Sequence, residues 1–187
     1  MGMRMHAEQS LILEGRPRWT RAKFEQLITL DGFGSGQVEL VKGELVKKEE
    51  GVPHGNGIEK LTELLVPRLV GRARVRIQLH LVVDDETVLM PDVTVVDRKA
   101  SRNFQPTRAL LAIEVADTSE RFDRIVKAPL YAQSGTGEYW IVNVKRGEVE
   151  VFSGLRNGRY SKHEKHHHGT LTVPGFDDVE IELSDLF

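Results

Sequence analysis

Two short apolar runs near the middle of the chain predict strands that are buried on both faces. The first is Val93–Val96, and the second is Leu110–Val115, which is interrupted by one carboxylate, Glu114. Short apolar runs bounded by polar residues are typical of such strands. Pro91 precedes the first run, where a missing N–H is tolerated, and Asp92 follows this proline. We therefore expect two central strands, each with a carboxylate near one end.

Apolar residues at helical spacing predict three helices. The first follows Thr20, a plausible N-cap, and ends near Asp31. The second opens at His54, runs for about 14 residues and carries the core stripe Ile58, Leu61, Leu65 and Leu69. The third follows 117–119, of which any residue can cap it, and its predicted buried side is Phe122, Ile125, Val126 and Leu130.

Alternating apolar and polar residues predict the remaining strands. Val38–Val41 and Glu44–Val46 flank Lys-Gly and form a predicted hairpin, because the glycine can supply a positive φ. Ala73–Val83 alternates throughout and predicts one half-buried strand. Tyr139–Val142 is rich in aromatic and β-branched residues, and Glu148–Phe152 is its expected hairpin partner.

These elements predict an α/β fold. We expect a mixed central sheet of four or more strands flanked by helices, with an N-terminal helix and a β-hairpin. The length of 187 residues suits one domain with a sizeable core. Residues 1–15 are predicted to form a loose N-terminal arm, and residues 16–187 a single domain.

Composition narrows the class of protein. The chain has no apolar run of about 18 residues, so no membrane span is expected. The N-terminus lacks the apolar core of a signal peptide, and the absence of cysteine excludes a thiolate metal site. A cytoplasmic bacterial protein fits these features. The net charge of −2 is unusual for a non-specific nucleic-acid binder. Either positive charge is gathered on one face, or dimerisation builds a basic groove, or DNA is not the partner.

The two central carboxylates suggest a metal site. Asp92 and Glu114 would repel each other unless a divalent cation lay between them. Lys127 lies 13 positions after Glu114 (127 − 114) on the third predicted helix. Asp, Glu and Lys around an Mg²⁺-type ion are the groups needed to hydrolyse a phosphodiester. The alternatives are a strand-end Glu114 that reaches solvent, and a surface pair of Asp123 with Lys127 worth about 0.3 kcal/mol.

An ordered set of residues carries a resemblance to a known family. The set is Pro91-Asp92, Glu114-Val115, Asp123, Lys127, Tyr131-Ala132, Gly135 and Glu138–Val142. It resembles the Uma-type restriction-endonuclease-like family, a branch of the PD-(D/E)XK nuclease superfamily. The resemblance extends upstream through 38–46 and Pro53-His54, and covers about residues 19–160.

The resemblance implies a metal-dependent endonuclease that hydrolyses nucleic-acid phosphodiester bonds, with DNA as the expected substrate. Asp92 and Glu114 would hold Mg²⁺ or Mn²⁺ together with the backbone carbonyl of Val115. Lys127 would position the attacking water. Because superfamily members often act as dimers, a homodimer is expected.

Two further residues are implied as members of the site. Glu39 matches the family motif in the hairpin and would hold a second metal or an outer-shell water, with Glu44 as the alternative. His54 would hydrogen-bond a catalytic carboxylate or the DNA backbone. The structural alternatives are a solvent-facing hairpin residue for either glutamate and a helix-start residue without chemistry for His54.

The sequence departs from the superfamily pattern at two positions. The common form has a lysine two residues after the glutamate, where this chain has Ala116. The Uma-type branch looks as if it had moved this ammonium to the helix, at Lys127. Pro129 lies two residues after that lysine, where a proline costs about 3 kcal/mol in a helix interior. We therefore expect a kink or a break there.

Other features leave the function open. The basic side of the strand with Arg72, Arg74 and Arg76 is either a phosphate-contacting patch or a solvated face. The polar loop 97–106 carries further cations and suggests a DNA contact. His163–His168 is either a solvated loop or a transition-metal site. The alternative function is a non-catalytic nuclease-like module that binds DNA or a protein.

Overall fold

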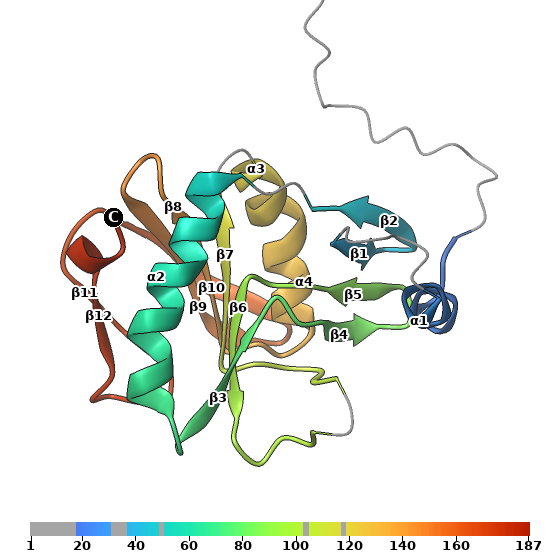
Figure 1. Ribbon diagram of the computed structural model, residues 1–187, viewed down its shortest axis with the longest axis horizontal. Helices are drawn as coiled ribbons and strands as arrows, with labels where there is room; N and C mark the ends of the chain where they lie inside the picture. The colour runs from blue at the N-terminus through green and yellow to red at the C-terminus, as the bar shows by residue number, and fades with distance from the viewer. Residues whose placement is uncertain (1–17, 31–36, 49–50, 103–104, 117–118) are drawn as a thin grey trace, which may run out of the picture.

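The computed structural model describes residues 18–30, 37–48, 51–102, 105–116 and 119–187 (Figure 1). The predicted loose arm, residues 1–15, lies outside the described residues, and so do the predicted first-helix end at residue 31 and the capping candidates Asp117 and Thr118. Within the described part of the chain, no helix is both long enough and apolar enough to cross a membrane.

A mixed sheet of six strands forms the centre of the fold, in the order β10-β9-β8-β7-β6-β3. Strands β7 and β8 are parallel, and every other neighbouring pair is antiparallel. The strands are β3 (Ala73–Ile77), β6 (Val93–Asp97), β7 (Leu111–Ala116), β8 (Glu138–Asn143), β9 (Glu148–Arg156) and β10 (Arg159–His166). Helix α2 (Val52–Leu69) covers one face of this sheet, and the helical segment after β7 covers the other. The predicted α/β fold with a mixed central sheet is confirmed.

Strand β7 is buried on both faces, and its alternation decides where Glu114 points. Ile113 and Val115 pack in the core that contains the leucines of α2. Ala112 and Ala116 pack in the opposite core, beneath the second helical layer. Since side chains alternate along a strand, Glu114 lies on the same face as these two alanines.

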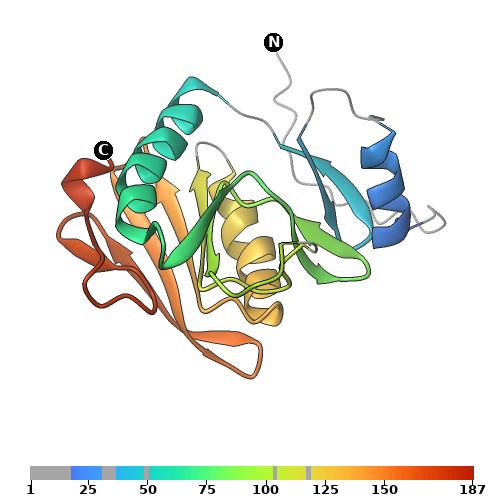
Figure 2. The same cartoon turned by 60° about the horizontal axis from the view of Figure 1, so that its bottom comes forward.

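A smaller sheet of four strands, in the order β2-β1-β5-β4, carries the predicted hairpin. Its strands are β1 (Val38–Val41), β2 (Glu44–Lys47), β4 (Leu81–Asp84) and β5 (Thr87–Leu89). At the hairpin turn Gly43 has a φ of +79°, which glycine adopts without strain. Figure 2 shows this sheet and helix α1 (Arg21–Thr29) beside the larger sheet. Helix α1 is capped by the Thr20 side chain and anchored by the fully buried Phe24.

The chain ends in a short two-stranded sheet next to the core of α2. Its elements are β11 (Thr170–Thr172), β12 (Glu180–Glu182) and the 3-10 turn η2 (Leu183–Asp185). Ile181 is fully buried between two exposed glutamates. This sheet covers the core on the side away from the second helical layer.

The prediction of one strand over residues 73–83 is wrong. The segment breaks at Gln78, which has a φ of +48°, and its two halves belong to different sheets. Strand β3 is an edge of the six-stranded sheet, and β4 is an edge of the four-stranded sheet. Apolar and polar residues alternate across the break without interruption, so the pattern alone did not reveal the change of sheet.

The third predicted helix is three consecutive segments. They are α3 (Glu120–Phe122), the π-helical turn η1 (Asp123–Lys127) and α4 (Ala128–Gln133). In the π-turn the Ala128 N–H bonds the Asp123 carbonyl, five residues back. Pro129 lies in the first turn of α4, where its missing N–H costs little. The break expected near this proline is thus a π-turn, which turns Asp123 and Lys127 inward and leaves Ile125 58% exposed.

Candidate active site

The central acids meet where the chain passes from the small sheet to the large one. The chain leaves β5 at Leu89 and enters β6 at Val93, with Asp92 at the junction. Because β6 is antiparallel to β7, the start of β6 lies beside the end of β7. Val93 pairs with Ile113, so Asp92 stands one position beyond this pair, next to Glu114. The predicted carboxylate pair is therefore brought together by strand register.

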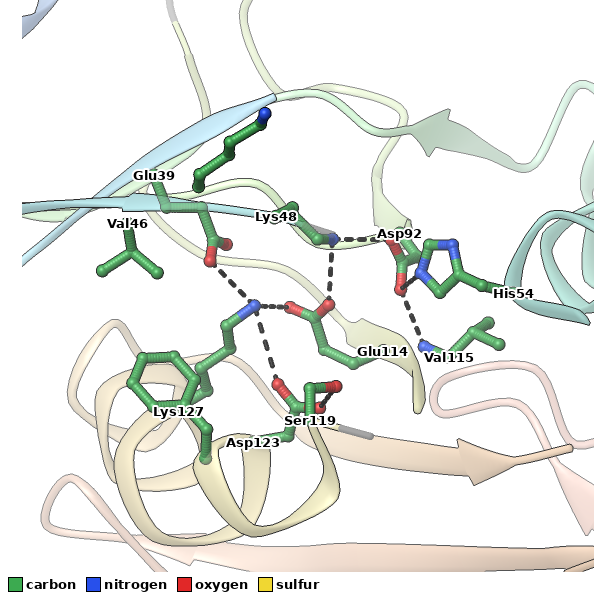
Figure 3. Close-up of a pocket in the computed structure, with 12 residues that line it drawn as sticks. Glu39, Val46, Lys48, His54, Asp92, Glu114, Val115, Ser119, Asp123 and Lys127 are labelled. Carbon is green, nitrogen blue, oxygen red and sulfur yellow. Dashed lines mark hydrogen bonds and ion pairs between the residues drawn. The ribbon is translucent and has the colours of Figure 1, made fainter. Parts of the chain in front are cut away.

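The two carboxylates line a pocket of about 240 Å³, which we call the acidic pocket (Figure 3). Every site residue predicted from the sequence lines it: Glu39, His54, Asp92, Glu114, Val115 and Lys127. Asp123 and Lys48 also line it. The residues come from β1, from the first turns of α2, from the two central strands and from η1. Glu44, the alternative to Glu39, is exposed and is not among them.

Lys127 is buried in a cage of carboxylates. Its Nζ lies 2.9 Å from Glu39 Oε2, 3.0 Å from Glu114 Oε1 and 3.7 Å from Asp123 Oδ1. Burial alone would lower the pKa of Lys127, but these acids, Glu114 first, raise it well above its usual value. The surface ion pair considered from the sequence is excluded, because both Asp123 and Lys127 are almost fully buried.

Asp92 is fully buried and uses its two oxygens differently. Its Oδ2 accepts hydrogen bonds from the Val115 N–H at 2.8 Å and from His54 Nε2 at 3.0 Å. A carboxylate only accepts, so the His54 ring donates here. Burial opposes ionisation of Asp92, but the bonds from His54 and Lys48 lower its pKa below the usual value. His54 thus contacts a site carboxylate, one of the two contacts that the family resemblance implies.

The two carboxylate oxygens of Glu114 also have different hydrogen-bond partners. Its Oε1 accepts from Lys127 and, at 2.6 Å, from the Tyr131 hydroxyl. Its Oε2 faces Lys48 at 3.2 Å. Burial raises the pKa of Glu114 to about 7, although both lysines counteract this effect. Glu114 does not reach solvent, since it is only 2% exposed.

Glu39 is held by both of its oxygens. Its Oε1 accepts a hydrogen bond of 2.7 Å from the Met90 N–H, and its Oε2 forms the ion pair with Lys127. Its side chain is 1% exposed, which excludes a solvent-facing hairpin residue. In this arrangement Glu39 ties the hairpin to the segment between β5 and β6 and orients the buried ammonium group.

Lys48, which we did not predict from the sequence, places an ammonium group between the two central carboxylates. Its Nζ donates to Asp92 Oδ1 at 2.6 Å and to Glu114 Oε2 at 3.2 Å, and to the Met90 carbonyl at 2.9 Å. Lys48 follows β2 in a run of charged residues that resembles a solvated strand end. The sequence signal that points to Lys48 is its position two residues after Val46. Residues two apart along a strand lie on the same face, and Val46 also lines the pocket.

The donor set fits a divalent cation. Asp92 Oδ1, Glu114 Oε2 and the Met90 carbonyl converge on one point, and hard oxygen ligands are those that Mg²⁺ and Mn²⁺ prefer. A cation already stands at this point, the ammonium of Lys48. Four carboxylates surround the ammonium groups of Lys48 and Lys127 and leave two negative charges when all are ionised (4 − 2), the charge that one divalent ion balances; a third lysine of the lining, Lys47, is exposed.

A second group of acids lies outside the acidic pocket. Ligand oxygens of Glu120, Glu148 and Glu150 lie within 4.8 Å of one another. Basic side chains neutralise them: Arg124 pairs with Glu120 and Glu150, and Lys165 with Glu148 and Glu150. This network is a poor metal site, because its oxygens already accept from cations.

The histidine-rich segment belongs partly to this network. His163–His166 lies on strand β10 rather than in the predicted loop. His163 Nε2 lies 2.7 Å from Glu150 Oε2, and His167 Nε2 lies 3.3 Å from Glu148 Oε2. These contacts give two of the histidines structural partners.

We expect Glu150 to contribute to stability at neutral pH and to lose this contribution in acid. Burial acts to raise its pKa, but hydrogen bonds from Arg124 and His163 lower it from 4.5 to about 2. A depressed folded-state pKa stabilises the fold above the unfolded value, and this stability is lost as the pH falls toward 2. The wild type and Glu150→Gln are compared by urea unfolding. The difference between their free energies of unfolding should narrow as the pH falls from 5 to 2, about the range between the unfolded and folded pKa values. A constant gap would contradict the assignment.

A known protein family matches most of the chain. The sequence matches the profile of the Uma2 family, described as "Putative restriction endonuclease", over residues 22–184. The chain belongs to the Uma2 family. This match confirms the family resemblance that the motif residues carry, and extends it toward the C-terminus.

A solved structure shares the fold of this Uma2 chain. It comes from Anabaena variabilis and is described as "a putative nuclease belonging to DUF820". The TM-score is 0.64 at 16% sequence identity, and the match covers 80% of this chain and 89% of that one. At this identity the similarity shows the fold alone. No curated protein matches the sequence.

Proposed function

We propose that this Uma2 protein is a metal-dependent endonuclease that hydrolyses phosphodiester bonds of DNA. One observation carries the proposal: two buried carboxylates from adjacent strands each direct one oxygen at the same point, where a cation already stands. The family description supports nuclease function, and the fold is that of a nuclease-like structure.

Asp92 Oδ1 and Glu114 Oε2 would hold Mg²⁺ or Mn²⁺, with a backbone carbonyl as the third protein ligand. Val115 was the predicted source of this carbonyl, whereas the carbonyl that accepts from Lys48 Nζ is that of Met90. A bound divalent ion would polarise the phosphate and lower the pKa of a coordinated water. His54 and the Val115 N–H hold Asp92 Oδ2, so that Oδ1 stays directed into the pocket.

Lys127 has two tasks in this proposal. It holds Glu114 Oε1 so that the other oxygen faces the ion, and its charge stabilises the negative charge that develops on the phosphate. The positioning of the attacking water by Lys127 remains a prediction. Glu39 orients this ammonium rather than binding the first metal ion, because both of its oxygens are already used.

Lys48 would compete with the metal for the same oxygens. We expect Lys48→Met to bind Mn²⁺ about tenfold more tightly, equivalent to about 1.4 kcal/mol, because no ammonium must be displaced. Isothermal titration calorimetry with Mn²⁺ measures this directly. Lys42→Met is the matched control, since it removes the same charge from an exposed residue of the hairpin that does not line the pocket. Equal or weaker Mn²⁺ binding by Lys48→Met would show that Lys48 does not occupy the ion's position.

A cleavage assay tests the proposed function. Purified protein is incubated with supercoiled plasmid, linear duplex and single-stranded RNA, each in Mg²⁺, in Mn²⁺ and in excess EDTA. We expect cleavage of the two DNA substrates with either metal and none in EDTA. Metal-independent cleavage, or cleavage of the RNA alone, would contradict the proposal.

The second candidate is a nuclease-like module that binds DNA or a protein without cutting. The ammonium of Lys48 favours it, because a protein cation at the ligand oxygens can replace a metal structurally. The two functions predict different calorimetry. If the protein is a non-catalytic module, titration of the wild type with Mn²⁺ would show no heat of binding, and none of the nucleic acids would be cut.

A further inference from the structure

A groove of about 500 Å³ lies along edge strand β3 and carries four arginines. Arg74 and Arg76 come from β3, whereas Arg98 and Arg102 come from the loop after β6. From the sequence these were two separate basic stretches, and the fold brings them to one place. We call the four residues the arginine groove.

Three of the four groove arginines are held in place by backbone carbonyl oxygens, without being neutralised. Arg74 donates to the Ala100 carbonyl at 2.6 Å, and Arg76 to the His80 carbonyl at 3.0 Å. Arg98 donates to a backbone carbonyl of the turn after α2. Carbonyl oxygens fix a guanidinium but carry no full charge, so the positive charge stays available to a ligand.

Two other arginines of the chain differ in this respect. Arg72 is paired bidentately with Asp178, and Arg124 with two buried glutamates. None of the described residues that line the arginine groove is acidic. The buried Nε atoms of Arg74 and Arg76 also have no hydrogen-bond partner in the part of the chain that the structure describes. Burial, and next the charge of Arg74, lower the pKa of Arg76, as expected where positive charge is uncompensated.

We propose that the arginine groove binds the phosphate backbone of duplex DNA and anchors the substrate away from the bond to be cut. This inference rests on the proposed function, since it assigns the binding surface of the same substrate. Arginine is the side chain best suited to phosphate oxygens, and backbone contacts of this kind position a duplex without reading its sequence. The groove also reconciles DNA binding with the net charge of −2, because it concentrates positive charge on one surface.

The distance from the acidic pocket suits this role. Helix α2 carries His54 at the pocket and Leu69 at the groove. Fifteen residues of α-helix span about 22 Å, which corresponds to about six base pairs at 3.4 Å each. We therefore expect the groove to contact the backbone about half a helical turn from the scissile phosphate.

The salt dependence of DNA binding tests the groove. Fluorescence anisotropy with a 20-base-pair duplex in EDTA measures binding without cleavage over a series of salt concentrations. Each lost phosphate contact should reduce the slope of log K against log salt by about 0.9, so Arg98→Gln/Arg102→Gln should lose about 1.8. These two residues are exposed, which limits any effect on folding. The matched control is Arg156→Gln/Arg159→Gln, which removes the same charge from exposed positions on the β9–β10 hairpin.

The outcomes separate the groove from the nuclease. A reduced slope in the groove variant alone supports the groove, even if the wild type cuts nothing. Equal slopes in the wild type and the groove variant, or equal losses in groove and control variants, overturn it, even if the wild type cuts DNA. Single-stranded RNA that binds with the same loss of slope would overturn the assignment to duplex DNA. A change of oligomeric state in the groove variant, seen by sedimentation, would instead assign the groove to a second copy of the chain.

Discussion

Replacing Lys127 by methionine is expected to lower the free energy of unfolding by about 3–5 kcal/mol, because breaking a buried ion pair leaves charges uncompensated. The substitution would leave Glu39, Glu114 and Asp123 facing one another without the ammonium between them. The melting temperature should fall by about 6–20 °C in a chain of this length. Urea unfolding at pH 7 in EDTA measures the change.

The control for this prediction is Lys165→Met. Lys165 also pairs with two glutamates, but its side chain is 44% exposed. Exposed ion pairs contribute about 0–1 kcal/mol, so this variant should unfold close to the wild type. If Lys127→Met were as stable as Lys165→Met, the carboxylate cage would not have the energetic role assigned to it.

Asp92→Asn should reduce DNA cleavage by at least about 100-fold. Losing a residue behind a metal ligand already costs 10–100-fold in metal affinity or activity, and Asp92 is proposed as a direct ligand. The variant keeps an oxygen that can accept from the Val115 N–H, but lacks the negative charge directed at the cation. Single-turnover cleavage of a labelled duplex in Mg²⁺ provides the measurement.

Glu44→Gln is the matched control for this loss. It removes one acidic charge from an exposed position of the hairpin next to the site. Cleavage by this variant should stay within about threefold of the wild type, in line with a surface charge that is screened by salt. A comparable loss of cleavage in both variants would indicate a general effect of charge and would contradict the role of Asp92 as a metal ligand.

The central part of the site could be predicted because local patterns determine it. The apolar runs of β6 and β7 identify strands buried on both faces, and a carboxylate within such a strand requires a partner. Antiparallel register then places Asp92 beside Glu114. The presence of Glu39 and His54 in the site was predicted only from the family resemblance. Each lies on an element that is brought to the central strands by the tertiary fold, which local patterns do not reveal.

The sequence pattern did not reveal three features, two of the backbone and one of charge compensation. The π-turn buries Asp123 and Lys127, whereas regular helical spacing placed Ile125 inside. The chain also changes sheets at Gln78 without any break in alternation. Lys48 was missed because a lysine in a charged run usually lies in solvent. Only the unpaired oxygens of two buried acids explain why it turns inward.

A crystal structure with Mn²⁺ would test the central claim most directly, because anomalous scattering locates the ion. The account predicts one peak between Asp92 Oδ1 and Glu114 Oε2, with the Lys48 ammonium displaced from its position between them. A peak at Glu120, Glu148 and Glu150 instead, or an unmoved Lys48 with no ion beside Asp92, would contradict it.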